Sequence, residues 1–198
     1  MANVNRVNGF RPVRYLSAAP YNGAATRYWV GTGDSTALFV GDLVKISGAN
    51  NTANGIRGVT QAAAGDAVCG AIVGFQVNVN DLDVPLNRAA ATEMYVWVAD
   101  DPSLLFVAQE DGATDPLEMA DAGLNVNFVV GSGSTVTGAS GMQIDSNTET
   151  TTATMTLKLI EPLQSPSNEL VAAGQSYTQW VVKINNHQLG SSTGTAGV

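Results

Sequence analysis

The sequence contains one cysteine and one histidine, and this scarcity excludes several classes of protein. Cys69 has no partner for an intramolecular disulfide, so a disulfide scaffold is excluded and an intracellular, reducing setting is favoured. A histidine-rich metal site is excluded, and a serine triad would depend on His187 alone. We expect Cys69, which lies in an apolar run, to be buried and inert, and His187 to form hydrogen bonds at the end of a strand.

Long apolar runs and positive charge are also scarce. The sequence has no signal-peptide pattern and no run of about 18 apolar residues, so we expect a soluble protein that bypasses the Sec route and has no membrane partner. Nine Lys and Arg residues stand against 17 Asp and Glu residues, and the net charge is −8. Proteins that bind nucleic acid need a basic face to neutralise phosphates, so we expect no direct nucleic-acid partner.

The few basic residues are unevenly distributed. Four of the nine precede Asp34, which is the first acidic residue of the chain; they are Arg6, Arg11, Arg14 and Arg27. The remaining five bases share the rest of the chain with all 17 acids, so a basic arm precedes an acidic body. This asymmetry predicts a protein that assembles with copies of itself or docks on a charged surface, and a merely solvated basic N-terminus is the alternative.

Period-two alternation of apolar residues dominates the chain. In residues 151–160, for example, Met155, Leu157 and Leu159 alternate with polar residues, as expected of a half-buried strand. Glycine-rich turns separate the alternating segments, and the one predicted helix is short, at residues 116–122. The pattern predicts an all-β protein, an antiparallel β-sandwich or barrel with a jelly roll among the options. Strands are expected over residues 37–47, 67–79, 92–98, 104–110, 124–130, 151–160 and 178–185.

Both ends of the chain have the composition of extended appendages. Residues 1–33 contain too many large aromatic side chains for a free disordered tail, which indicates that something covers this segment. The last residues are small and uncharged, and are either a linker or a strand that orders against a neighbour. We therefore expect an extended N-terminal arm over residues 1–33, a β domain over residues 34–189 and a flexible C-terminal tail over residues 190–198.

The motifs of enzyme active sites are nearly absent. Neither a nucleophile elbow nor a complete nucleotide-binding fingerprint occurs, and we expect no enzymatic activity, no metal and no cofactor. Paired carboxylates could serve a glycosidase or ligate calcium, but they fall at predicted strand ends, where acidic residues typically form turns. These pairs are Asp81-x-Asp83, Asp100-Asp101 and Glu110-Asp111.

Two other functions are open at this stage. A carbohydrate-binding or hydrolysing β-sandwich would use Trp29, Trp97 and Trp180 to stack on sugars, although packing in a core or interface is the more usual role of tryptophan. A self-assembling shell or tube subunit is the second alternative, and would polymerise without a partner.

Several segments resemble a known family. Residues 1–16, MANVNRVNGFRPVRYL, are similar to the N-terminus of the structural cement (head decoration) proteins of tailed bacteriophages. The similarity continues in FVGDLV (39–44), YVWVADDP (95–102), GASGM (138–142) with Ile144-Asp145, and WVVKINNH (180–187), so that it spans nearly the whole chain. The resemblance implies a non-enzymatic β-protein that is made in the host cytoplasm, binds the outside of the capsid and clamps adjacent major capsid subunits.

Such a protein would contact the major capsid protein and neighbouring copies of itself, as a dimer or trimer. An extended arm can add strands to exposed sheet edges, and its arginines can pair bidentately with carboxylates while aromatic side chains anchor the contact. The residues expected to bind the partner are Arg6, Phe10, Arg11, Arg14, Tyr15, Tyr21 and Arg27.

Overall fold

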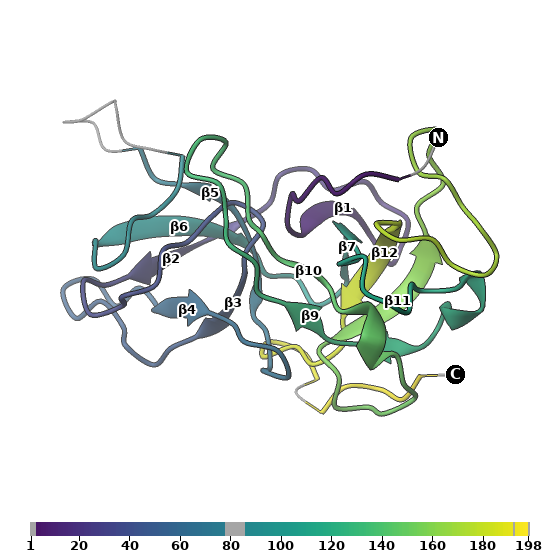
Figure 1. Ribbon diagram of the computed structural model, residues 1–198. Coiled ribbons are helices and arrows are strands. Elements are labelled where there is room, and N and C mark those ends of the chain that lie inside the picture. Colours follow the sequence, from purple (N-terminus) through teal and green to yellow (C-terminus); the bar gives the residue numbers. More distant parts are fainter. Residues whose placement is uncertain (1–2, 78–85, 192, 198) are drawn as a thin grey trace.

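The computed structural model describes residues 3–77, 86–191 and 193–197, and within them the regular secondary structure is almost entirely β-strand (Figure 1). Two single-turn 3-10 helices, η1 (Met119–Asp121) and η2 (Ser146–Thr148), interrupt the strands. The strands are β1 (Arg11–Tyr15), β2 (Thr26–Val30), β3 (Leu43–Ile46), β4 (Val59–Gln61), β5 (Gly70–Phe75), β6 (Met94–Ala99), β7 (Leu104–Gln109), β8 (Asn125–Val126), β9 (Phe128–Val129), β10 (Gln143–Ile144), β11 (Leu157–Pro162) and β12 (Gln179–Ile184).

The strands form two five-stranded sheets and one small sheet. Sheet A has the order β1-β7-β12-β11-β8, sheet B has the order β2-β6-β5-β3-β4, and β10 pairs with β9. All of these strand pairs are antiparallel. Figure 1 shows sheet B at the left and sheet A at the right. The predicted all-β class is confirmed, and the arrangement is consistent with a β-sandwich.

Alternation along each strand creates the core. In β7 and β12, Phe106, Trp180 and Val182 point to the inner face of sheet A, where they join Leu43 and Val68 from the side of sheet B. A second buried cluster lies under sheet B and is built from Tyr28, Val30, Leu38, Val44, Val59, Cys69, Ile72, Val96 and Val98. The first cluster therefore joins the two sheets, because it takes buried side chains from both.

Predicted and observed strands agree best where the alternation is longest. The strands predicted over residues 92–98, 104–110 and 178–185 correspond to β6, β7 and β12. β3 covers only the later part of the predicted segment 37–47, and β11 begins later than the predicted segment 151–160 and runs two residues beyond it. The segment 124–130 is divided into β8 and β9. The segment predicted over residues 67–79 contains β5, and its last two residues lie outside the described chain. The helix predicted at 116–122 is wrong except for the single turn η1, and β1, β2, β4 and β10 were not predicted.

The N-terminal segment is built into both sheets. β1 is an edge strand of sheet A, paired with β7, and β2 is an edge strand of sheet B, paired with β6. Phe10 is 1% exposed, and its ring meets that of Phe128 edge to face at 6.2 Å between centroids. Phe10 thus belongs to the core instead of anchoring a partner as expected, because so deeply buried a side chain cannot reach one.

The described part of the C-terminal tail lies against the β domain. Thr195 donates its backbone N–H to Asn185 Oδ1 at 2.9 Å, and its carbonyl accepts from Asn125 Nδ2 at 2.7 Å. Gly197 donates to the Thr151 carbonyl at 2.9 Å. Asn125 and Asn185 are both buried, and the tail adds to the hydrogen bonds that their side-chain amides already donate to the carbonyls of Thr152, Ala153 and Met155.

Cys69 is buried and is not in a disulfide, which confirms the predicted location of its thiol. Burial is the main cause of the raised pKa of this thiol, which also donates a hydrogen bond to the Tyr28 hydroxyl at 3.3 Å. A raised pKa keeps the sulfur protonated and unreactive near neutral pH. Within the described ranges, no helix is long and apolar enough to cross a membrane.

Candidate functional site: a basic face and an aromatic face

The outer face of sheet A gathers arginines and lysines from distant parts of the chain. On β1, Arg11 lies opposite Val107 and Arg14 lies opposite Leu105. On the other side of β7, Lys183 of β12 also lies opposite Leu105. Opposed residues of an antiparallel pair share a face of the sheet, so these three cations project from the same side, away from the main core.

Two further bases complete this surface. Lys158 of β11 lies opposite Lys183, and burial together with the Lys183 charge lowers the Lys158 pKa. Arg6 lies at the other end of the face, where its backbone N–H donates to Gln109 Oε1 at 2.8 Å. The basic face is defined here as Arg6, Arg11, Arg14, Lys158 and Lys183, which are five of the nine bases of the chain.

A small apolar cluster lies beneath the basic face, and an acidic residue, Glu161, lies beside the basic side chains. Leu105, Val107 and Val181 lie beneath the charged side chains and form a small buried cluster of their own. Arg14 Nη2 reaches Glu161 Oε1 at 2.6 Å, and the two side chains are 35% and 50% exposed. At this exposure the pair is worth at most about 1 kcal/mol, so Arg14 can exchange Glu161 for a carboxylate of a partner.

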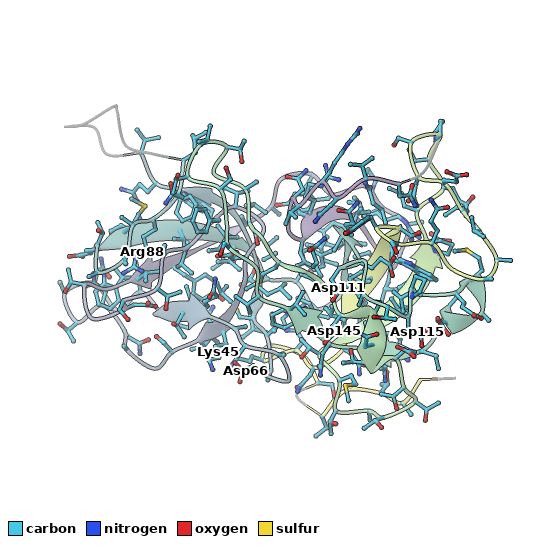
Figure 2. All side chains as sticks on the ribbon, in the orientation of Figure 1. Lys45, Asp66, Arg88, Asp111, Asp115 and Asp145 are labelled. Atoms are coloured by element: carbon cyan, nitrogen blue, oxygen red, sulfur yellow. The ribbon has the colours of Figure 1, made fainter. Side chains whose placement is uncertain are left out.

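A cluster of carboxylates lies on the loops around η1 and η2. Burial raises the pKa of Glu149, and the charges of Asp121, Asp115 and Asp145 raise it further. Asp111 accepts a hydrogen bond from the Ser146 hydroxyl at 3.0 Å. Figure 2 labels three of these residues on the side of sheet A. The acidic cluster is defined as Asp111, Asp115, Asp121, Asp145 and Glu149.

The outer face of sheet B is aromatic. Arg27 of β2 lies opposite Trp97 of β6, and Trp29 lies opposite Tyr95, while the alternate residues of both strands enter the core. The Arg27 guanidinium lies over the Tyr95 ring, 5.1 Å from its centroid. The Tyr95 hydroxyl accepts from the Asn54 side-chain amide at 2.7 Å. The aromatic face is defined as Arg27, Trp29, Tyr95 and Trp97.

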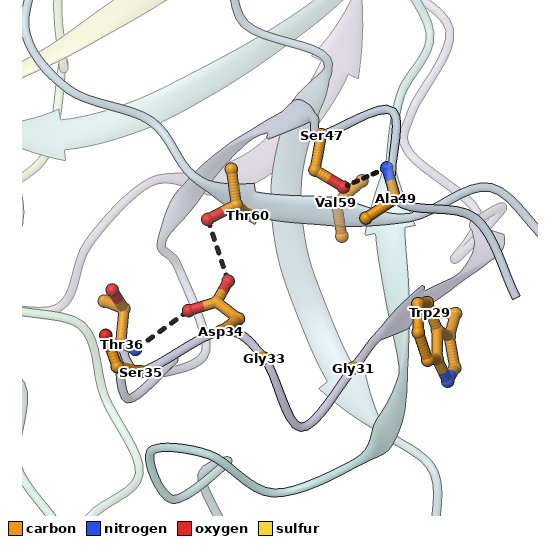
Figure 3. A pocket seen from close by; sticks show the side chains of 10 residues that line it. All are labelled: Trp29, Gly31, Gly33, Asp34, Ser35, Thr36, Ser47, Ala49, Val59 and Thr60. Atoms are coloured by element: carbon orange, nitrogen blue, oxygen red, sulfur yellow. Dashed lines mark hydrogen bonds between the residues drawn. The ribbon is translucent and has the colours of Figure 1, made fainter.

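A pocket of about 560 Å³ opens beside Trp29 (Figure 3). Figure 3 shows Trp29 at one end and Asp34 toward the other. Hydroxyl-bearing side chains and small residues make up most of the wall between them. The lining residues are Trp29, Gly31, Gly33, Asp34, Ser35, Thr36, Ser47, Ala49, Val59 and Thr60.

Arg88 holds one wall of this pocket in place from within. Its side chain is completely buried, and it is labelled in Figure 2. Its guanidinium donates to four backbone carbonyls, those of Gly31, Asp34, Thr36 and Thr92. Burial lowers the Arg88 pKa, and the Asp34 carboxylate, 3.6 Å away, opposes this change. Because a planar fork of donors meets carbonyls in fixed directions, Arg88 fixes the shape of the loop.

The structure divides the predicted partner-binding residues among three places. Arg6, Arg11 and Arg14 lie on the basic face, whereas Arg27 lies on the aromatic face of the other sheet. Tyr15 and Tyr21, like Phe10, face the main core, where they are partly buried. Lys158 and Lys183 were missed. Alternation alone puts both lysines on the solvent side of their strands, but the sequence does not show that these strands share a sheet with β1.

Two of the predicted carboxylate pairs, Asp100-Asp101 and Glu110-Asp111, directly follow the ends of β6 and β7, and one of them has an unexpected property. Asp101 accepts from the Ser103 backbone N–H at 2.7 Å as a turn residue does, whereas Asp81 and Asp83 lie outside the described residues. Glu110 is completely buried, and burial raises its pKa to about 7. Its oxygens accept from backbone N–H groups, including that of Leu117 at 2.9 Å. Among the residues described, no group of three or more His, Cys, Asp or Glu is placed to hold a metal ion.

His187 follows β12 by three residues and is 2% exposed. Nδ1 accepts a hydrogen bond from the Leu189 backbone N–H at 3.0 Å, and burial lowers the pKa of the ring to about 4. The ring therefore stabilises the turn that follows the strand, as expected from the sequence.

The three tryptophans differ in exposure. Trp180 is completely buried, Trp97 is 39% exposed, and Trp29 lines the pocket.

Comparisons of the chain with protein-family models, curated proteins and solved structures find no match.

Proposed function

We propose that this chain is a non-enzymatic cement or decoration protein that binds the outer surface of a bacteriophage head and clamps adjacent major capsid subunits. The observation that carries the proposal is the basic face, which concentrates five of nine bases in a chain whose net charge is −8. The phage head is named as the partner because segments of the sequence, such as residues 1–16, resemble head decoration proteins. In this proposal, the protein is made in the host cytoplasm and ends on the virion surface.

Attachment would follow from the placement of charge on a rigid sheet. The arginines of β1 can pair bidentately with carboxylates of the major capsid protein, and each exposed pair contributes about 0.2–1 kcal/mol. Several such pairs act together when one molecule bridges two subunits, since the second contact is then intramolecular. A protein that binds only the assembled shell stabilises that shell by mass action.

The same charges allow contact between copies of the chain. The acidic cluster is complementary in charge to the basic face, so one copy can present carboxylates to the arginines of the next. Such a contact joins two different surfaces, and it forms a closed ring when the rotation between copies closes. Dimers and trimers on the shell are both compatible with this arrangement.

Charge reversal on β1 tests the proposal. Purified undecorated heads of the phage that encodes the chain are mixed with the parent, Arg11→Glu or Arg14→Glu, and bound protein is measured after sedimentation. We expect both variants to occupy the heads less than the parent does. In Arg14→Glu, the new carboxylate also faces Glu161, its partner in the parent chain. Raising the salt concentration should weaken binding of the parent, because exposed charges are screened.

The matched control is Arg57→Glu, which makes the same charge change at an exposed arginine on the side of sheet B. Occupancy equal to that of the parent is expected for this control. If Arg11→Glu and Arg14→Glu bind heads as well as the parent does, the basic face is not the attachment surface. Polymerisation of the purified parent without heads would instead favour the self-assembling shell or tube subunit.

A further inference from the structure

We propose that the pocket beside Trp29 binds a neutral saccharide. The site lies on sheet B and is independent of the basic face of sheet A. A pyranose ring carries C–H groups on its two faces and hydroxyl groups around its edge. A site for it therefore needs a flat aromatic surface and convergent hydrogen-bonding groups, and this pocket has both.

The aromatic wall is held in place before any ligand arrives. Trp29 Nε1 donates to Glu93 Oε1 at 2.9 Å, which fixes the orientation of the indole. The ring also packs against the backbone at Gly31, where an added Cβ atom would collide with it. A fixed ring loses little conformational entropy when a sugar stacks on it, so more of the contact free energy contributes to binding.

The polar end of the pocket offers both acceptors and donors. Asp34 Oδ1 accepts from the Thr36 backbone N–H, and Oδ2 accepts from the Thr60 hydroxyl, both at 2.8 Å. Each carboxylate oxygen accepts two hydrogen bonds, so both can also receive a sugar hydroxyl. Ser47 Oγ accepts from the Ala49 N–H at 3.3 Å, and its hydroxyl hydrogen can be donated to a ligand.

The charges around the pocket favour a neutral ligand. None of the lining residues is a cation, and Asp34 contributes a negative charge. Arg88 lies near Asp34, but its guanidinium is completely buried and donates to backbone carbonyls. Phosphates and carboxylates would therefore find no cation to pair with. The volume of about 560 Å³ falls within the range of about 300–1,000 Å³ that is usual for small-ligand sites.

The aromatic face extends the site beyond the pocket. Tyr95 lies directly across from Trp29 on the neighbouring strand, and Trp97 lies two residues further along it. The Arg27 guanidinium lies over the Tyr95 ring, and the side-chain amides of Asn51 and Asn54 both donate to the Tyr95 hydroxyl. Trp97 is 39% exposed, so a further sugar unit of an oligosaccharide can stack on it, and we expect oligosaccharides to bind more tightly than single sugars.

The test is an array that carries neutral and sialylated glycans, probed with the full-length protein. Neutral glycans should bind and sialylated caps should weaken the binding. Hits are then titrated in solution by ligand-observed saturation-transfer NMR. Trp29→Ala should weaken binding about fivefold, since an aromatic stacking contact is worth about 1 kcal/mol. Trp29→Phe should retain part of the affinity, because it keeps an aromatic ring, and it also serves if Trp29→Ala fails to fold.

Arg11→Glu is the matched control for this site. We expect this variant to weaken head attachment and to leave the glycan affinity unchanged. The proposal is overturned if no neutral glycan binds, if only sialylated glycans bind, or if Trp29→Phe and folded Trp29→Ala both bind like the parent. Conversely, loss of glycan binding with normal head attachment would leave the proposed function intact. The experiments therefore distinguish failure of the saccharide proposal from failure of the proposed head attachment.

Discussion

Two buried titratable side chains should give the stability of this protein opposite pH dependences that largely cancel. Burial raises the Glu110 pKa from the ordinary value of 4.5 to about 7 and lowers the His187 pKa from 6.5 to about 4. One pKa unit corresponds to about 1.4 kcal/mol, so each displacement changes the free energy of unfolding by about 3 kcal/mol across its pH range.

The signs follow from which state binds the proton more tightly. Between pH 4.5 and about 7, folded Glu110 keeps a proton that the unfolded chain releases, so its contribution falls as the pH rises. Between about pH 4 and 6.5, unfolded His187 binds a proton that the folded chain excludes, so its contribution rises with pH. Over the shared range, the two slopes oppose each other.

Replacing one group at a time separates the two slopes. Glu110→Gln should become more stable relative to the parent as the pH rises from 4.5 to 7, by about 3 kcal/mol. His187→Asn, whose side-chain oxygen can replace Nδ1 as the acceptor for Leu189 N–H, should lose relative stability as the pH rises from 4 to 6.5, by a similar amount. The difference from the parent matters here, because the other titrating groups cancel in it.

The assay is urea unfolding at a series of pH values, followed by the fluorescence of the buried Trp180 and by circular dichroism. The m-value of each variant should equal that of the parent, so that midpoints can be compared directly. The two variants control for each other, since the same assay must return opposite signs. A pH-independent difference for either variant would refute the claim that its side chain titrates away from its ordinary range in the folded protein.

Two other substitutions test the packing. Phe10→Ala should destabilise the protein by about 3–5 kcal/mol, measured by urea unfolding, because it removes a buried ring. Its control is Val13→Ala on the same segment, which should have little effect because Val13 is 38% exposed. Arg88→Met should lower the free energy of unfolding by about 3–5 kcal/mol, because four backbone carbonyls lose their donor. Its control, Arg57→Met at an exposed position, should lower it by about 1 kcal/mol or less. Equal losses for both members of either pair would contradict the burial of Phe10 or of Arg88.

The sequence by itself determined the fold class and the separation of charge. Period-two alternation such as that of Leu157 and Leu159 is a local property, so it predicts a strand without knowledge of its neighbours. The burial of Cys69 follows in the same way from its apolar flanks. The sequence also singles out Arg6, Arg11 and Arg14, because no acid offsets them along the chain, and the structure places all three on the basic face. Each of these conclusions uses residues that are close together in sequence.

Only the tertiary structure decided which faces these residues share. Alternation gives each strand two faces, but the pairing of distant strands decides which face is buried and what lies beside it. The register of β1 with β7, and of β7 with β12, brings Arg14 and Lys183 to either side of Leu105. The same pairing carries Phe10 into the core. Burial of Glu110 depends likewise on loops packed over it, because the free energy that shifts its pKa is a property of the whole surrounding fold.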